Sequence, residues 1–243
     1  MPLNTTPRRT SSTLSRHPDY FFPEADVTFE VDNVLFRAHK RFFIRESAYF
    51  RALFTAPPIP CQDPPGSETN PVVLEHTSVD GFAGLLWVFY NPRYSIYNTT
   101  VEKWQSILTL AQRWGFKEVE ELCVRELEKL PIPPVEKIYI YQKFKLNASL
   151  LLESYAKLTN RAEPIDLEEG RKLGIDTSLL IARARELSRG TGSHTSPRSP
   201  SAIQLESKDL QRLIREVFGL GELLNGSAQP MVTPIPSHHM GNY

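Results

Sequence analysis

His39 is the residue that most suggests chemistry in this sequence, because two basic residues follow it in the stretch FRAHKRFF, residues 36–43. A histidine can act as a general base or bind a metal ion. A base needs a nucleophile or carboxylate in reach, and a metal needs further ligands. Nothing near His39 has ligand spacing, and the residues after it follow an apolar helical pattern. We therefore predict that His39 is structural and that its imidazole bonds to backbone groups left free at the helix start.

Acidic clusters are the second candidate for chemistry. Three glutamates lie between residues 118 and 121, and a pair stands at Glu168-Glu169. Both groups fall in amphipathic helix patterns, where first-turn acidic residues are usually solvated. The sequence shows no G-x-S-x-G, no phosphate loop and no Cys–His nucleophile signature, and its two cysteines lack metal-ligand spacing. We predict that the protein is not an enzyme and that it uses no cofactor or metal.

The composition restricts the partners and the compartment. The 243 residues include 28 Lys+Arg and 28 Asp+Glu, for a formal net charge of zero. A neutral chain has no overall field that draws it onto phosphate backbones, so we expect no nucleic-acid binding. We find no signal-peptide core at the N-terminus and no run near the length of a membrane span. We expect an intracellular protein, cytoplasmic or nuclear, without membrane contact.

A hairpin is predicted just before His39. Residues 27–31 alternate apolar and polar side chains, which is typical of a half-buried strand. Asp32-Asn33 forms a plausible two-residue turn, and residues 34–38 alternate again. From His39 the period becomes helical and predicts one amphipathic helix against the hairpin. Its apolar stripe has the spacing i, i+4, i+7 and i+11: Phe43, Ser47, Phe50 and Phe54.

The remaining pattern is mainly helical. The prolines of residues 55–71 predict a surface loop, and Val72–His76 reads as a short strand. Ser78, Thr100 and Gly115 supply helix boundaries in the region that follows. Helices are predicted at about 79–90, 101–114, 119–130, 135–145 and 148–159, and a further helical segment ends at Leu187.

A separate helix is predicted beyond a linker-like stretch that starts after Gly190. Because a single short helix is marginal in water, its apolar face must either dock on its own domain or bind a partner. The sequence leaves both alternatives open. The residues of this candidate partner-binding face are Leu210, Leu213, Ile214, Val217 and Phe218.

This order of elements resembles the BTB/POZ domain. The matching stretches are Asp26-Val27, VDNVLFRAHK, RESAYFRALF, VVLEH and FAGLLWVFYNP, and residues 134–186 are similar to the C-terminal region of fungal, mushroom-type BTB proteins. The resemblance implies an α+β fold, a small mixed sheet with a helical cluster and a helical C-terminal extension. Its fold-signature positions are Asp26, His39, Ser47, Phe50 and Phe54. The implied organisation is a disordered N-terminus (1–15), a BTB/POZ-like domain (16–131), a helical extension (132–190) and a mostly disordered tail (191–243) with a short amphipathic helix near 207–219.

The resemblance implies a non-catalytic protein–protein interaction module that forms homo- or hetero-oligomers and recruits partners, including other BTB proteins. Asp26 and Lys40 match positions that form a charged pocket at the dimer interface of zinc-finger-type relatives. The alternative is that Asp26 only caps the start of the strand while Lys40 is solvated.

Two narrower functions also follow from the resemblance. One is a substrate adaptor of a cullin-type ubiquitin ligase, and the other is a transcription or chromatin cofactor without direct DNA contact. Cullin-binding members carry a hydrophobic–x–Glu motif in the loop that corresponds to residues 55–71. That motif is absent here, and Gly66-Ser67-Glu68 is the nearest candidate.

Overall fold

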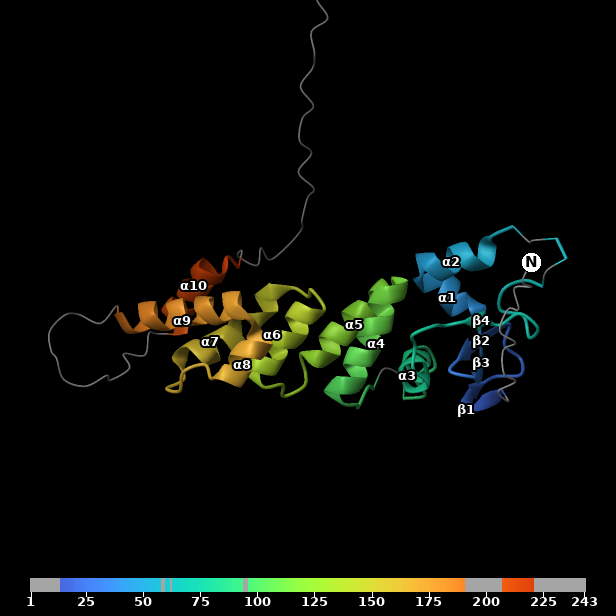
Figure 1. The fold of residues 1–243 in the computed structure, drawn as a ribbon, viewed down its shortest axis with the longest axis horizontal. Coiled ribbons are helices and arrows are strands. Elements are labelled where there is room, and N and C mark those ends of the chain that lie inside the picture. Colours follow the sequence, from blue (N-terminus) through green and yellow to red (C-terminus); the bar gives the residue numbers. More distant parts are fainter. Residues whose placement is uncertain (1–13, 58–59, 62, 94–95, 191–206, 221–243) are drawn as a thin grey trace, which may run out of the picture. The chain divides into compact units, whose positions relative to one another are not determined.

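The computed structural model confirms the expected α+β fold, a small mixed sheet followed by many helices (Figure 1). It describes residues 14–57, 60–61, 63–93, 96–190 and 207–220. Most of the disorder predicted for the N-terminus (1–15) and the tail falls on residues 1–13, 191–206 and 221–243, which lie outside the described ranges, whereas Ser15 begins the first strand. The chain divides into two compact units, residues 1–146 and 147–243, and each is described by itself.

The hairpin has the register that the alternation predicts. Strands β2 (Val27–Val31) and β3 (Val34–Ala38) pair antiparallel, with Val31 opposite Val34. Asp32 and Asn33 between them have φ values of 45° and 64°. A two-residue type I′ turn needs this left-handed backbone, which Asp and Asn adopt more readily than most residues. Every residue of β2 is buried, so this strand is covered on both faces and is not half-buried as predicted.

Two further strands complete a sheet of order β1-β3-β2-β4. β1 (Ser15–Phe21) runs parallel to β3, and β4 (Val72–Val73) runs parallel to β2. The sequence did not predict β1, because Pro18 interrupts it and its side chains do not alternate. β4 has two residues where five were predicted, and its extended run stops before His76, which has a φ of 53°.

The single helix predicted from His39 is wrong. The structure has two helices, α1 (Lys40–Glu46) and α2 (Ala48–Thr55), with Ser47 extended between them at φ −124° and ψ 123°. Ser47 both ends α1 and caps α2, because its side-chain oxygen accepts a hydrogen bond from the Phe50 backbone N–H. The apolar residues keep a helical spacing through Ser47 although the chain turns a corner there, which is why the sequence pattern predicted one helix.

Four longer helices complete the described part of the first unit: α3 (Val79–Phe89), α4 (Val101–Trp114), α5 (Lys117–Leu127) and α6 (Pro134–Lys143). Ser78 and Thr100 cap α3 and α4 through their side-chain oxygens, as their positions predicted. Gly115 ends α4 with a φ of 70°. The core of this unit is an aromatic cluster of six phenylalanines without solvent exposure: Phe29, Phe36, Phe43, Phe50, Phe82 and Phe116.

The second unit is helical over its described residues. It consists of a 3-10 turn, η1 (Ala148–Leu151), followed by α7 (Leu152–Asn160), α8 (Leu167–Leu173), α9 (Ile175–Gly190) and α10 (Ser207–Phe218). The sequence predicted one helical segment up to Leu187, but a break at Gly174, with a φ of 78°, separates α8 from α9. Asp166 and Glu169 form a capping box at the start of α8.

Candidate interaction surfaces

Asp26 and Lys40 meet within one chain, through the backbone of Lys40. The Asp26 Oδ1 atom accepts a hydrogen bond from the Lys40 N–H at 2.7 Å, and Lys40 is the first residue of α1. Asp26 therefore caps a helix, which satisfies one of the free N–H groups at its start. The Lys40 ammonium lies over the Phe54 ring, 5.2 Å from its centroid. The Lys40 side chain is thus not tied to the Asp26 carboxylate by this bond.

His39 stands at the strand–helix junction, but its imidazole does not bond to the helix start as predicted. No side-chain capping bond comes from His39. Instead the Tyr90 hydroxyl accepts a hydrogen bond from the His39 backbone N–H at 2.8 Å and lies 2.9 Å from the His39 Nδ1 atom. Burial raises the pKa of the Tyr90 hydroxyl, so it keeps its proton as a donor. The Asp26 carboxylate already occupies the helix start, and the ring turns toward α3.

Ser47 has the most complete set of bonds among the signature residues. Its hydroxyl donates to the Trp114 carbonyl oxygen at 2.6 Å and accepts from the Phe50 N–H at 3.2 Å. The side chain is fully buried. A small residue with both a donor and an acceptor is needed here, because α1, α2 and the end of α4 meet at this point.

Phe50 belongs to the aromatic cluster of the first unit, and Phe54 packs against it. Phe50 is fully buried and contacts the Phe43 ring at a centroid distance of 5.1 Å and the Trp114 ring at 5.4 Å. Phe54 is half-buried and stacks on Phe50 at 5.9 Å. Both residues hold α2 against the rest of the unit, so their contacts are those of packing residues.

The titratable groups of the described residues include no candidate metal cluster, and the buried cysteine is hard to ionise. No group of three or more His, Cys, Asp or Glu side chains in the described ranges could hold a metal ion. Burial raises the pKa of the Cys123 thiol to about 12, and a thiol is a poor nucleophile unless it ionises. In the part of the chain that the structure describes, no helix combines the length and the apolar character needed to cross a bilayer.

The apolar face of α10 packs within its own unit. Leu210 and Ile214 are buried, and the helix contacts α7 and α9. The Phe218 ring stacks on Tyr155 with a centroid distance of 3.9 Å. Of the two alternatives that the sequence left open for this helix, docking on its own domain is the one observed. Leu213 and Val217 are half-buried on the same helix.

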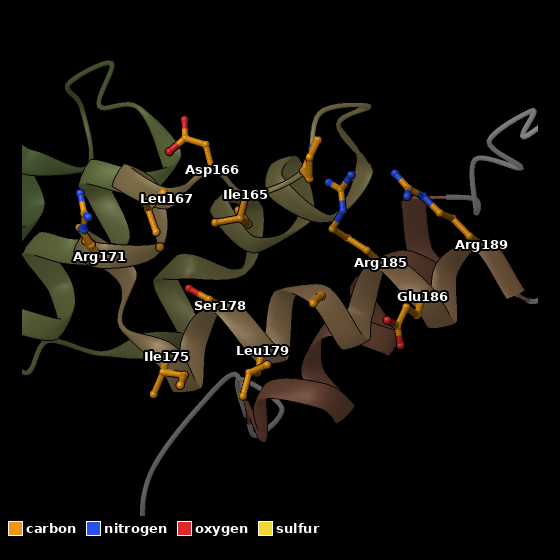
Figure 2. Close-up of a pocket in the computed structure, with 13 residues that line it drawn as sticks. Ile165, Asp166, Leu167, Arg171, Ile175, Ser178, Leu179, Arg185, Glu186 and Arg189 are labelled. Carbon is orange, nitrogen blue, oxygen red and sulfur yellow. The ribbon is translucent and has the colours of Figure 1, made fainter.

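A groove in the second unit exposes apolar side chains instead of covering them (Figure 2). It lies between α8 with the residues before it and one face of α9, and has a volume of about 780 Å³. Leu167, Ile175 and Leu179 line it and are 70%, 75% and 62% exposed. Large apolar side chains gathered in a hollow are typical of a binding surface.

The charged residues of this groove are mainly arginines. Arg171, Arg185 and Arg189 line it, together with Asp166 and Glu186. Arg185 is buried, with only 6% of its surface exposed. Its guanidinium donates hydrogen bonds to the carbonyl oxygens of Leu158, at 2.8 Å, and Ala162, at 3.1 Å. Burial lowers the pKa of Arg185, and the neighbouring arginines lower it further, because each disfavours a second positive charge.

Sequence reasoning missed this groove. Its exposed residues Ile175 and Leu179 are four apart on α9, a spacing that also fits a core face. The sequence did hold one signal: Ile181 and Ala184 place apolar residues on a second face of α9. The structure shows that this second face is the buried one. A helix that is apolar on two faces needs two partners.

A smaller hollow lies in the first unit beside β4. It has a volume of about 280 Å³, and its lining includes Tyr49, Val73 and Arg113. Tyr49 and Val73 are about half exposed, at 53% and 49%. Arg113 donates to the His76 carbonyl oxygen at 3.0 Å, which fixes its guanidinium at this edge.

Comparison with known proteins finds similarity within the first unit. Residues 21–130 match the family model of the BTB/POZ domain. Over 96 residues, which make up 40% of this chain, the sequence is 33% identical to BTB/POZ domain-containing protein 9 of Bos taurus. The chain spans only 15% of the length of that relative.

The BTB/POZ match contains every signature position from Asp26 to Phe54 and the hollow beside β4. It ends before the second unit, so the α8–α9 groove lies outside it. The similarity of residues 134–186 to fungal BTB proteins stays a prediction, as does the dimer-interface role of Asp26 and Lys40.

Proposed function

We propose that this chain is a non-catalytic protein–protein interaction module that oligomerises and recruits protein partners. The observation that carries the proposal is the match of residues 21–130 to the BTB/POZ domain, a family of modules that generally bind proteins. The proposed organisation is a BTB/POZ-like domain at 16–131 and a helical extension at 132–190. The contacts of His39, Ser47 and Phe50 support this proposal, because all three serve the fold of the domain.

Self-association is the first form of this function. Light scattering after size exclusion, at tens of micromolar protein, is expected to give about twice the 27.7 kDa of one chain or more. A single 27.7 kDa species at that concentration contradicts oligomerisation and leaves recruitment of other proteins as the remaining form.

Lys40 allows a specific test of the proposed interface charges. Its backbone N–H, not its side chain, bonds to Asp26, so Lys40→Glu keeps the helix cap. If the side chain lies at a dimer interface, this variant is expected to weaken the dimer while the thermal midpoint stays close to that of the wild type. Lys103→Glu is the control, because Lys103 is exposed and, like Lys40, lies over an aromatic ring. If the two variants form dimers of equal stability, the Lys40 side chain does not contribute to the interface.

Cullin binding is the second candidate, and the geometry of the loop argues against it. Gly66 stands where the motif needs its hydrophobic residue, and it is buried with a φ of 86°. A Cβ atom there would lie 2.5 Å from the Val27 Cγ2 atom, so the position has no room for an apolar anchor. Glu68 is exposed and lies 3.8 Å from Arg16. A pull-down with purified cullin is expected to show no binding; retention of the cullin on the wild-type chain would favour the adaptor role.

A further inference from the structure

The α8–α9 groove is formed within the second unit and has a rigid support. α9 packs on α7 and α10 through its opposite side, where Ile181 and Ala184 are fully buried. On the groove side, Leu167, Ile175 and Leu179 remain mostly in water. Covering one such side chain is worth about 1.5–3 kcal/mol, so a partner that covers all three gains a large part of its binding energy there.

The groove has an apolar part and a basic part, arranged along α9. Ile175 and Leu179 stand near the start of the helix, whereas Arg185 and Arg189 stand near its end, four residues apart (Figure 2). With a rise of about 1.5 Å per residue, the centres of the two parts are about 15 Å apart. This is the length of two to three helical turns.

The lining of the groove carries more positive than negative charge, because Arg171, Arg185 and Arg189 stand against two carboxylates, Asp166 and Glu186. Within the described residues, the hydrogen bonds of the Arg185 guanidinium go to the carbonyl oxygens of Leu158 and Ala162, which carry only partial charges. Of the two carboxylates that line the groove, Asp166 caps the start of α8 by accepting from the Glu169 N–H at 2.8 Å. Its charge is therefore offset by the positive end of that helix. An excess of positive charge remains beside the exposed apolar residues.

We propose that this groove binds an acidic amphipathic helix of a partner protein. The apolar side chains of the partner would cover Leu167, Ile175 and Leu179, and its carboxylates, two to three turns away, would pair with the exposed Arg189, beside which the buried Arg185 adds positive charge. The inference rests on the proposed function and places partner recruitment in the second unit. A second copy that presented the same groove would bring three arginines against three arginines with two carboxylates on each side, and so fits less well than an acidic partner.

The test is a selection from a phage-displayed library of random peptides of about 16 residues, long enough for four helical turns, on the full chain. The selected peptides are expected to combine apolar residues at helical spacing with acidic residues two to three turns away. Their affinity, measured by fluorescence polarisation, is expected to fall at least about tenfold in Leu179→Asp and in Arg189→Glu, because each removes one side of the recognition. Both residues are exposed, so the fold is expected to persist, which circular dichroism checks.

Two matched controls sharpen the test. Arg183→Glu changes an exposed arginine of α9 that does not line the groove, and Ile96→Asp changes an exposed apolar residue of the first unit. Both are expected to bind the peptides like the wild type. Enrichment of no peptide, enrichment of peptides without acidic residues, or equal binding by Leu179→Asp would overturn the inference.

The oligomeric state of the same variants separates this inference from the proposed function. If Leu179→Asp abolishes peptide binding and leaves the oligomer unchanged, the groove is a partner site apart from self-association. If that variant instead dissociates the oligomer, a second copy occupies the groove and the acidic partner is rejected. A monomeric wild type that still binds the peptides contradicts only the oligomerisation part of the proposed function.

Discussion

The Ser47 hydroxyl donates to the Trp114 carbonyl oxygen, 67 residues further along the chain, at a distance of 2.6 Å. This bond joins the corner between α1 and α2 to the end of α4, and the same hydroxyl caps α2. One side chain thereby satisfies two backbone groups in a fully buried site.

Ser47→Ala is expected to destabilise the first unit by about 1–3 kcal/mol, because it leaves a buried carbonyl oxygen without its donor and α2 without its cap. Urea unfolding followed by tryptophan fluorescence measures this loss. Ser106→Ala is the control: Ser106 is exposed on α4, and its hydroxyl donates to the Glu102 carbonyl oxygen within the same helix. Its change is expected to stay within about 0.5 kcal/mol. Equal effects of the two substitutions would contradict a special role for Ser47.

Gly66→Ala is expected to cost more than about 2 kcal/mol, since the new Cβ atom meets the Val27 side chain and the φ of 86° disfavours any other residue. Gly170→Ala is expected to have the opposite sign. Gly170 lies inside α8, its Cβ would make only ordinary contacts, and alanine favours the helix by about 1 kcal/mol. Thermal unfolding midpoints of the two variants on either side of the wild-type value would bear this out.

The two cysteines are expected to differ in reactivity. Cys61 is exposed, whereas Cys123 is fully buried and its thiol has a pKa of about 12. At pH 8 only about one Cys123 thiol in ten thousand is ionised, so iodoacetamide should label Cys61 alone in the folded protein. Mass spectrometry of tryptic peptides reads this directly, and labelling in urea provides the control in which both react. Rapid labelling of Cys123 in the native protein would show that its helix opens readily.

Glu169 is expected to give the second unit part of its pH dependence. Hydrogen bonding to Arg161 lowers the pKa of Glu169 below its usual value of 4.5. Because the folded pKa is depressed, the stabilisation is present above about pH 4.5 and is lost as the pH falls through the lower folded value. Glu169→Gln should therefore be less stable than the wild type at pH 7, with the difference shrinking toward pH 3. Glu168→Gln, at an exposed neighbouring position, should show no such convergence.

The hairpin could be predicted in detail from sequence, whereas the break at Ser47 could not. Residues 27–38 alternate apolar and polar side chains, and their Asp-Asn pair suits the left-handed backbone of a tight turn. Both signals are local. At Ser47 the apolar spacing fits an unbroken helix, and the reason for the break is a hydrogen bond to Trp114, which lies far away in sequence. Local patterns hold no information on such a contact.

The signature positions were also partly predictable from the sequence, whereas the α8–α9 groove was not. Positions such as Asp26 and His39 could be named from the family resemblance, but their partners, the Lys40 N–H and the Tyr90 hydroxyl, came only from the structure. The groove could not be named at all, because Ile175 and Leu179 have residue types that normally lie in a core. Only the packing of α9 shows which of its apolar residues stay in water.

The two edge strands of the sheet give the first unit little capacity for uncontrolled aggregation. β4 offers an edge only two residues long, and Pro18 removes one amide donor from the middle of β1. A free edge with a full row of donors and acceptors would template the addition of foreign strands, and short or proline-interrupted edges discourage it. In a chain that we propose to act by association, the least selective route of association is thus blocked, and contact is left to the side chains.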